Sequence, residues 1–213
     1  EIDKNSTGEL AGKKVAVPLG TAAHYGFLKQ MSHFGVDVGS MEVVDMDPPD
    51  GAAAIAQGAV DMFCGWGGSL RRALEHGNVL LTGAEKTDLG ILVFDVTSGP
   101  ADWVAENSDL VAKFLKITAD ANAMWADKSN HAKMLPAIAK DAGMDEEATA
   151  STMATFTFPT VDDQLSGAWL GGAAQEFMKG VADVFVEAKS IDGALDSYEA
   201  AVNTGPLSAA KGM

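Results

Sequence analysis

Strand-like and helical patterns alternate along the first half of the chain, and this alternation constrains the fold more than any other feature. Short β-rich runs cover residues 13–18, 41–46, 60–65, 78–81 and 90–96. Helical patterns begin between these runs at Thr21, after the double proline at 48–49, and at Gly67. Because the connections are short, we expect a parallel sheet whose strands are joined by helices. The predicted class is therefore α/β.

The second half of the chain has a different character, which begins after the Gly-Pro pair at 99–100. Apolar residues recur at helical spacing over residues 101–127, and further helical patterns cover 130–141, 145–154 and 161–188. Gly171 and Gly172 interrupt the last pattern, so they either weaken the helix or mark close packing. An all-helical half after a small sheet is unusual for an independent domain, and this indicates that it packs against a partner lobe.

Charge and composition narrow the possible partners. The 213 residues include 30 acidic and 15 basic side chains, for a formal net charge of −15 at pH 7. Such a chain lacks the clustered Lys and Arg that neutralise phosphates, so neither nucleic acid nor an anionic membrane surface is expected as a partner. No apolar run reaches the ~18 residues typical of a membrane-spanning helix. Residues 1–8 are polar and do not form a signal peptide, so either a signal was removed or the chain begins internally.

The connection between the first strand and the first helix, residues 18–25, has the features of an anion-binding turn. Gly20 has no Cβ, so the backbone can approach a ligand closely. Thr21, Ala22 and Ala23 place N–H groups without intrahelical partners at the first helical turn, where the helix dipole favours negative charge. The Thr21 hydroxyl either donates to the ligand or only caps the helix. The turn contains no Lys or Arg, so it is not a P-loop.

Three aromatic side chains are candidates to line a pocket near this turn. His24 and Tyr25 follow it directly, although a lone histidine on a helix is more often packed or exposed than functional. Trp66 stands at the carboxyl end of the run 60–65, where ligands of open α/β sheets bind. It therefore either walls a pocket or only packs against the fold.

Asp95 is the most informative acidic residue because it lies within the apolar run 91–96. A carboxylate buried in such a strand is costly unless it is paired. The residue therefore either binds an ammonium or guanidinium group of a ligand, forms a buried salt bridge, or points outward at an edge.

Other chemistry has little support in the sequence. No His-x-x-x-His pair or cysteine cluster is present, so neither a metal site nor a cofactor is expected. The single cysteine, Cys64, lies in an apolar run and is interpreted as a small buried hydrophobe rather than a nucleophile. Ser98, Ser151 and Ser166 lack a Gly-x-Ser-x-Gly setting, and no nucleophile–base–acid set emerges. A binding protein is therefore favoured over an enzyme.

The motifs resemble those of a known family. Residues 10–18, followed by residues 21–25, resemble the start of the second lobe of taurine-binding proteins. These are periplasmic substrate-binding components of ABC transporters in the taurine, alkanesulfonate and nitrate group. Further matches follow in order at 44–49, 56–61, 65–66, 94–96 and 103–125. The resemblance spans residues 10–205, and its early part is the more specific.

This resemblance implies a two-lobed periplasmic-binding-protein-like fold of type II. Residues 11–98 would form the α/β second lobe, and residues 99–213 a helical segment that returns to the first lobe, whose N-terminal part is missing here. It implies a solute-binding component of an ABC importer, located in the periplasm, with the membrane permease of the transporter as its partner.

The resemblance also implies roles for individual residues. The amides of residues 21–23, beside Gly20, would hold the sulfonate of taurine or a related small sulfonate, and Asp95 would hold its amine. Trp66 would cover the ligand, and His24 or Tyr25 would line the site. Ala22 stands where family members usually have a second hydroxyl residue, which leaves fewer side-chain donors.

Two alternative functions stay open at this point. The chain could bind another small solute, such as nitrate, an aromatic acid or a different amino-sulfonate. It could also be an enzyme similar to the thiamine-pyrimidine synthases that share this fold, for which Cys64 and His24 are the available reactive side chains.

Overall fold

The computed structural model describes residues 2–91, 93 and 95–213. The chain forms two compact units. The first comprises Glu1–Phe94 and Val184–Ile191, and the second Asp95–Asp183 and Asp192–Met213. The chain therefore leaves the first unit after Phe94, returns to it over Val184–Ile191, and ends in the second unit.

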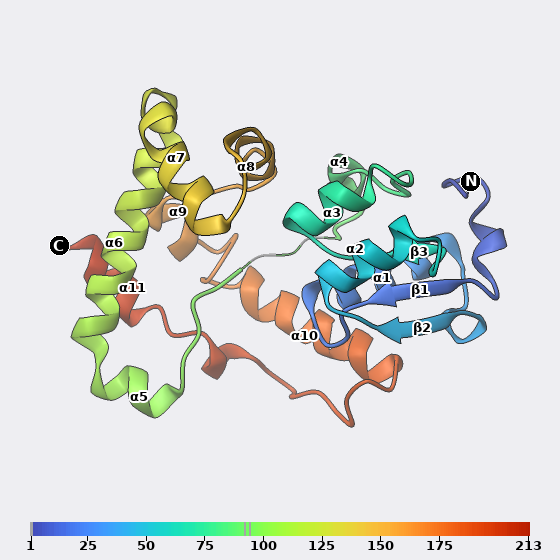
Figure 1. Ribbon diagram of the computed structural model, residues 1–213. Coiled ribbons are helices and arrows are strands. Elements are labelled where there is room, and N and C mark those ends of the chain that lie inside the picture. The colour runs from blue at the N-terminus through green and yellow to red at the C-terminus, as the bar shows by residue number, and fades with distance from the viewer. Residues whose placement is uncertain (1, 92, 94) are drawn as a thin grey trace. The chain divides into compact units, whose positions relative to one another are not determined.

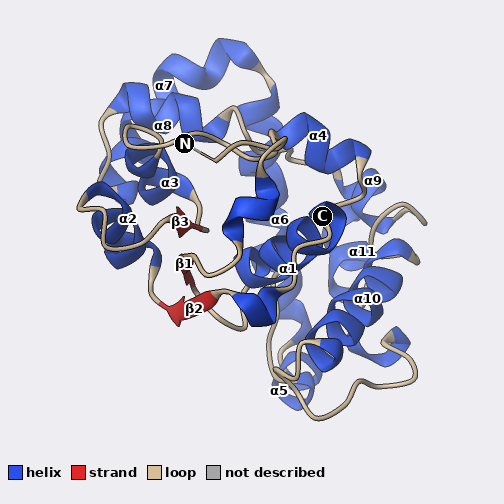
Figure 2. Cartoon of the chain, turned by 90° about the vertical axis from the view of Figure 1, so that its right-hand side faces the viewer, coloured by secondary structure: helices blue, strands red, loops and turns tan. Residues whose placement is uncertain are grey.

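The first unit contains a three-stranded parallel sheet, which confirms the predicted α/β class (Figures 1 and 2). Its strands are β1 (Lys14–Val17), β2 (Glu42–Asp45) and β3 (Met62–Phe63), in the order β2-β1-β3. The crossovers are α1 (Ala22–Phe34) and α2 (Pro48–Ala56), and α3 (Gly67–Ala73) follows β3. The register pairs Lys14 with Glu42 and Val15 with Met62. The strands and helices predicted over residues 13–76 are therefore present in the expected order.

The central strand packs on both faces, because successive side chains of a strand point to opposite sides. Val15 and Val17 are fully buried in a cluster with Leu10 and with Phe27 and Met31 of α1. Ala16 points the other way, toward α2, where a Cβ placed on Gly51 would lie 3.3 Å from the Ala16 Cβ. The helices α1 and α2 therefore cover opposite faces of the sheet.

The run 78–81 is not a strand, contrary to the prediction. Its two leucines face the core, whereas Val79 is exposed: Leu81 is buried, and Leu80 packs against the cluster around Phe27. The chain then enters α4 (Gly83–Asp88), which a Thr82–Glu85 capping box begins. The strand predicted over residues 90–96 includes Leu92 and Phe94, which lie outside the described residues; its described members belong to no strand.

The described part of the second unit is helical, and most of its helices match the predicted patterns. The helices are α5 (Ala101–Glu106), α6 (Ser108–Ala126), α7 (His131–Ala142), α8 (Glu146–Met153), α9 (Val161–Leu165) and α11 (Gly205–Lys211). A further helix, α10 (Ala173–Glu187), begins in the second unit and ends in the first, which includes Val184–Ile191. Short 3-10 turns occur in the second unit at Lys128–Asn130 and Glu199–Ala201, and in the first unit at Thr7–Leu10 and Val38–Ser40. The helix α11 packs against α6 (Figure 1).

Two long helices predicted in this half are each interrupted. The helix expected over 101–127 breaks at Asn107, whose side-chain amide donates to the Trp103 carbonyl at 2.9 Å and so competes with the helical hydrogen bonds. The helix expected over 161–188 breaks between α9 and α10. A Cβ on Gly171 would lie 2.7 Å from the Ser166 carbonyl oxygen, so the glycine marks close packing.

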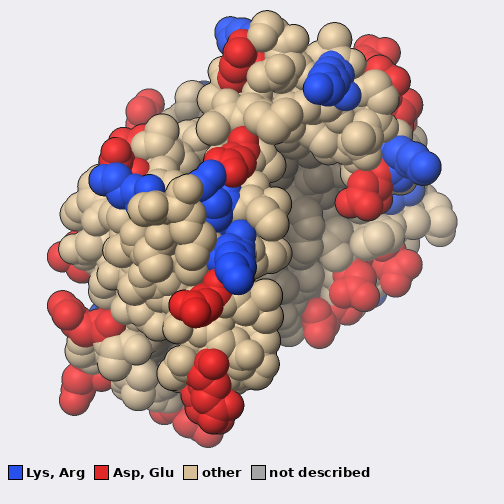
Figure 3. Space-filling view, turned by 90° about the vertical axis from the view of Figure 1, so that its left-hand side faces the viewer, with Lys and Arg blue, Asp and Glu red and all other residues tan. Residues whose placement is uncertain are grey.

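The surface carries charges of both signs, and the described helices lack the features of membrane spans. Acidic and basic side chains are intermixed on the face shown in Figure 3. Within the described residues, no helix combines the length and apolar character needed to cross a membrane.

Candidate functional site

The order of the strands identifies the edge of the sheet where a ligand is expected. From β1 the chain crosses to β2 on one side, and from β2 it passes to β3 on the other. Ligands of open α/β sheets bind beyond the carboxyl ends of the strands, where such a reversal of strand order occurs. Residues 18–21 follow β1 and residues 64–66 follow β3. The structure therefore brings the predicted turn and Trp66 to the same edge of one sheet.

The predicted turn, residues 18–25 and called the anion turn below, has the backbone geometry of a strand entering a helix. Gly20 has a φ of +73°, a left-handed conformation that favours glycine. Thr21 is the N-cap of α1: its hydroxyl accepts from His24 N–H at 3.4 Å and donates to the Pro18 carbonyl at 2.6 Å. Of the two roles left open for this hydroxyl, capping is the one that the structure records.

The backbone amides of the anion turn fall into two groups. The Leu19 N–H donates to Oδ1 of Asp45 at 2.9 Å, and the Gly20 N–H donates to Nδ1 of His24 at 3.2 Å. Within the described part of the chain, the N–H groups of residues 21–23 have no hydrogen-bond partner, and Ala22 is exposed. Three successive amide donors at the N-terminus of a 13-residue helix are therefore available to an anion.

His24 lies inside the fold, and the residue is only 5% exposed. Its ring stacks on Phe185 of α10, with the ring centroids 5.1 Å apart. Burial lowers the pKa of His24, whereas the nearby Asp45 carboxylate acts in the opposite direction. A neutral imidazole that accepts through Nδ1 carries its proton on Nε2. The neighbouring Tyr25 is also buried, and burial raises the pKa of its phenol.

Trp66 and Asp95, the other predicted site residues, are both exposed. Trp66 is 51% exposed, and it occupies the N-cap position of α3 at the carboxyl edge of the sheet. Asp95 belongs to the second unit and to no strand. The argument from the cost of a buried carboxylate therefore does not apply to Asp95, and its contact with a ligand amine stays a prediction.

Sequence reasoning missed two residues that contact the anion turn. Asp45 ends β2, beside β1, and a polar residue at the end of a neighbouring parallel strand was the available signal. Phe185 contacts His24 from α10, far along the chain, and nothing in the local sequence pattern could have indicated this pairing.

Two other polar residues in the first unit have structural roles. Asp61 lies at the opposite edge of the sheet, where its Oδ2 accepts from the Lys14 N–H at 3.0 Å, and this bond lowers the pKa of the carboxyl. Cys64 follows β3, and burial raises the pKa of its thiol to about 12. Among the described residues, no cluster of three or more His, Cys, Asp or Glu side chains could hold a metal ion.

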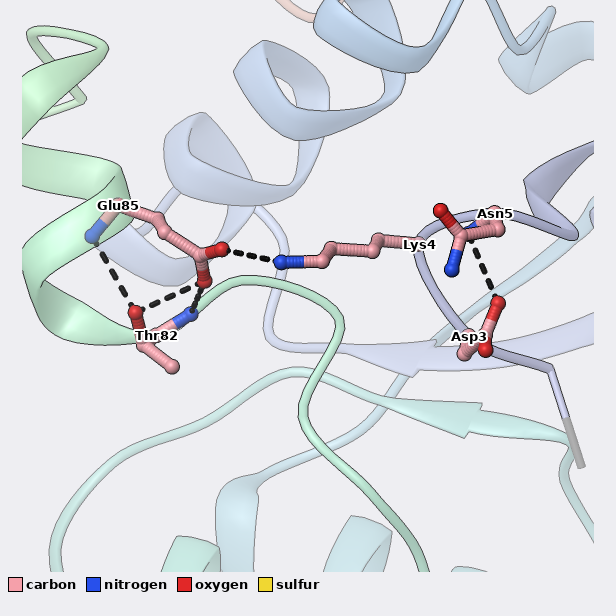
Figure 4. Close-up of polar contacts among 5 residues, drawn as sticks. All are labelled: Asp3, Lys4, Asn5, Thr82 and Glu85. Atoms are coloured by element: carbon pink, nitrogen blue, oxygen red, sulfur yellow. Dashed lines mark hydrogen bonds and ion pairs between the residues drawn. The ribbon is translucent and has the colours of Figure 1, made fainter.

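A separate hollow of 430 Å³ lies beside the N-terminal segment. It contains an ion pair between Nζ of Lys4 and Oε1 of Glu85, 2.6 Å apart (Figure 4). The second Glu85 oxygen accepts from the N–H and hydroxyl of Thr82, both at 2.8 Å. These contacts tie the N-terminal segment to α4.

Comparison with known proteins places these observations in a family context. The sequence pattern of the family described as NMT1/THI5 like matches residues 3–132. The taurine-binding periplasmic protein of Escherichia coli K12 is 29% identical over 113 residues, which make up 53% of this chain and 35% of that protein.

Two solved structures share the fold. The periplasmic aliphatic sulphonate-binding protein SsuA from Escherichia coli matches with a TM-score of 0.67 and 21% identity, over 89% of this chain and 62% of that one. A periplasmic sulfonate-binding protein, SsuA, from Methylobacillus flagellatus KT matches with a TM-score of 0.65 and 18% identity, over 98% and 63%. The predicted periplasmic-binding-protein-like fold is confirmed, and the chain spans less than two thirds of the length of these relatives.

Proposed function

Because this chain belongs to the NMT1/THI5-like family, we propose that it is the solute-binding component of an ABC importer that binds taurine or a related small sulfonate. One observation supports this above all: the amides of residues 21–23 are free at the N-terminus of α1, at the carboxyl edge of a parallel sheet. The similarity to a taurine-binding periplasmic protein points to the same ligand class.

The chemistry of a sulfonate fits these donors. A sulfonate is a permanent monoanion with three oxygen acceptors, and three successive N–H groups with the positive end of the helix dipole oppose it. A hydrogen bond to a charged group contributes about 1.5–3 kcal/mol. Since the Thr21 hydroxyl caps the helix and Ala22 offers only its backbone, the amides are the donors expected to hold the anion.

The remaining parts of the ligand are assigned to two exposed side chains. Asp95 would bind the ammonium group of taurine through a charge-assisted hydrogen bond. The Trp66 indole would cover the ligand, since it is exposed at the same edge of the sheet as the anion turn. A periplasmic location and a membrane permease as partner belong to the same proposal.

A binding role is favoured over catalysis by the state of the two reactive side chains. The Cys64 thiol, with a pKa of about 12, is protonated at neutral pH and is a poor nucleophile. The His24 ring is buried, and its Nδ1 already accepts a backbone hydrogen bond. Neither side chain is thus prepared for nucleophilic or acid–base chemistry.

Titration calorimetry with taurine, ethanesulfonate and nitrate tests the proposal on wild-type protein and two variants. Asp95→Ala should weaken taurine binding about tenfold or more and leave ethanesulfonate unchanged, because only taurine carries an amine. Asp109→Ala, which removes an exposed charge from α6, is the matched control and should bind both ligands as wild type does.

The outcomes separate the parts of the proposal. Equal losses for both sulfonates in Asp95→Ala would contradict the role of Asp95 but not the sulfonate site. No binding of either sulfonate by the wild-type chain would contradict the proposed ligand class. A thermal-shift screen of nitrate, aromatic acids and other amino-sulfonates would then identify another solute, because a bound ligand stabilises the folded state.

A further inference from the structure

We propose that His24 and Asp45 are positioning residues of the anion turn. His24 binds the Gly20 amide and Asp45 binds the Leu19 amide, and these two contacts fix the amides of residues 21–23 for the ligand. This inference rests on the proposed function, because it concerns how the same site holds an anion. It differs from the expectation that His24 contacts the ligand itself.

Asp45 is anchored by the sheet. It ends β2 in register with Val17, and the next residue, Met46, donates its N–H to the Val17 carbonyl at 3.3 Å. From this fixed position, Oδ1 of Asp45 accepts from the Leu19 N–H at 2.9 Å. Leu19, the first residue after β1 that has a backbone N–H, is therefore held by the neighbouring strand β2.

His24 is anchored by packing. Its ring is buried and stacks on Phe185, at an interplanar angle of 25°. With the ring held in this way, Nδ1 accepts from the Gly20 N–H at 3.2 Å across the turn. Gly20 is the residue in the left-handed conformation, so this bond fixes the sharpest point of the turn.

These two contacts define both the donor set and its dependence on pH. A proton added to Nδ1 of His24 removes the acceptor of the Gly20 N–H and places two hydrogens against each other. Among the described residues, the charged group that acts on the His24 ring is the Asp45 carboxylate; it favours this protonation, whereas burial opposes it. Acidification should therefore release the turn and weaken anion binding. An imidazolium in direct contact with the sulfonate would have the opposite effect.

Paired substitutions separate positioning from simple packing. His24→Phe keeps an aromatic ring against Phe185 but has no acceptor, whereas His24→Asn keeps an acceptor near the position of Nδ1. Asp45→Ala removes the acceptor of the Leu19 N–H, and Asp45→Asn keeps it. Calorimetry should show that His24→Phe and Asp45→Ala weaken taurine and ethanesulfonate alike, by about tenfold, and that both asparagine variants stay within about threefold of wild type.

The pH profile provides a readout that a purely structural role would not change. Wild-type affinity for ethanesulfonate should fall on acidification, and because burial lowers the pKa of His24, the fall should lie below the ordinary histidine pKa of about 6.5. His24→Phe should lose this dependence. Affinity that rises on acidification, or wild-type binding by both His24→Phe and Asp45→Ala, would overturn the inference and leave the proposed function standing.

A ligand-free measurement covers the case in which no sulfonate binds. Nitrogen chemical shifts should show the His24 proton on Nε2, and the Gly20 amide should be protected from hydrogen exchange in the wild type but not in His24→Phe. A proton on Nδ1, or an unprotected Gly20 amide in the wild type, would refute the positioning role. Circular dichroism of each variant, compared with its asparagine partner, distinguishes these effects from loss of folding.

Discussion

Gly51 of α2 offers a direct test of how the first unit packs. An alanine Cβ at this position would lie 2.6 Å from Cδ2 and 2.7 Å from Cε2 of Phe63, and 3.3 Å from the Cβ of Ala16. Ala16 is fully buried in the central strand. The Phe63 ring also lies against Gly65, where a Cβ would come within 2.3 Å of its Cζ. The ring therefore has little room to move.

The expected cost of Gly51→Ala follows from two opposing effects. Overpacking of a core contact costs about 1–3 kcal/mol, whereas the higher helix propensity of alanine offsets up to about 1 kcal/mol. With the full offset, the variant should therefore lower the free energy of unfolding of the first unit by up to about 2 kcal/mol. Combining it with Phe63→Leu, which removes the clashing ring atoms, should reduce the additional effect of the alanine.

Native-state hydrogen exchange at the β1 amides is the assay, because it reads the unfolding free energy of the first unit even if the two units unfold separately. Gly26→Ala is the matched control: it lies within α1, and its added Cβ would meet nothing within 4 Å. This control should stabilise the unit by about 0.5–1 kcal/mol. A Gly51→Ala protein as stable as the Gly26→Ala protein would refute the packing argument.

Three further predictions concern single residues. Gly20→Ala should lower the free energy of unfolding, measured by urea denaturation, by about 1–2 kcal/mol, and Gly20→Asn should lower it less. The cost comes only from the left-handed backbone conformation, because an added Cβ would meet no neighbouring atom within 4 Å. Equal losses in the two variants would contradict this reasoning. The pKa of Glu85 is lowered from 4.5 to about 2, mainly by the Lys4 ammonium and next by the Thr82 amide. The ionised Glu85 carboxylate therefore stabilises the folded state fully above about pH 4.5, and this contribution is lost as the pH falls to about 2. In Glu85→Gln, the melting temperature should therefore fall less steeply on acidification than in the wild type. The same decrease in both proteins would contradict the ion pair. The Cys64 thiol, with a pKa of about 12, should react slowly with a thiol reagent at pH 8 until urea unfolds the chain, and rapid labelling of the folded protein would contradict its burial.

Local signals explain why the first part of the fold could be predicted. The double proline at 48–49 begins α2, and Thr21 and Gly35 cap the two ends of α1. Each of these effects acts over a few residues, so the sequence pattern contains it. The strand predicted over residues 78–81 was wrong because the signal there is not local. The leucines of this run pack into the core of the first unit from a loop, and a short apolar run does not distinguish a strand from such a loop.

The same distinction applies to the candidate site. The free amides of residues 21–23 follow from a glycine and a helix start, and both are visible in the sequence. The contact of Leu19 with Asp45 depends on the register of two strands, and the contact of His24 with Phe185 joins residues far apart in the chain. Such contacts leave no local pattern, so the sequence indicated the free amides of residues 21–23 but not the contacts of Leu19 and Gly20 beside them.

The absence of a basic residue from the anion turn makes these holding contacts important for affinity. Residues 18–25 contain no Lys or Arg, so backbone dipoles, rather than a point charge, must balance the charge of the anion there. A point charge attracts an anion from any direction, whereas an N–H donor loses strength steeply once its angle falls toward about 120°. A site built from amides therefore gains affinity mainly from orientation fixed before binding. If the proposed sulfonate site is correct, this requirement accounts for the buried histidine and the strand-end carboxylate that bind the Gly20 and Leu19 amides, which the ligand would not use.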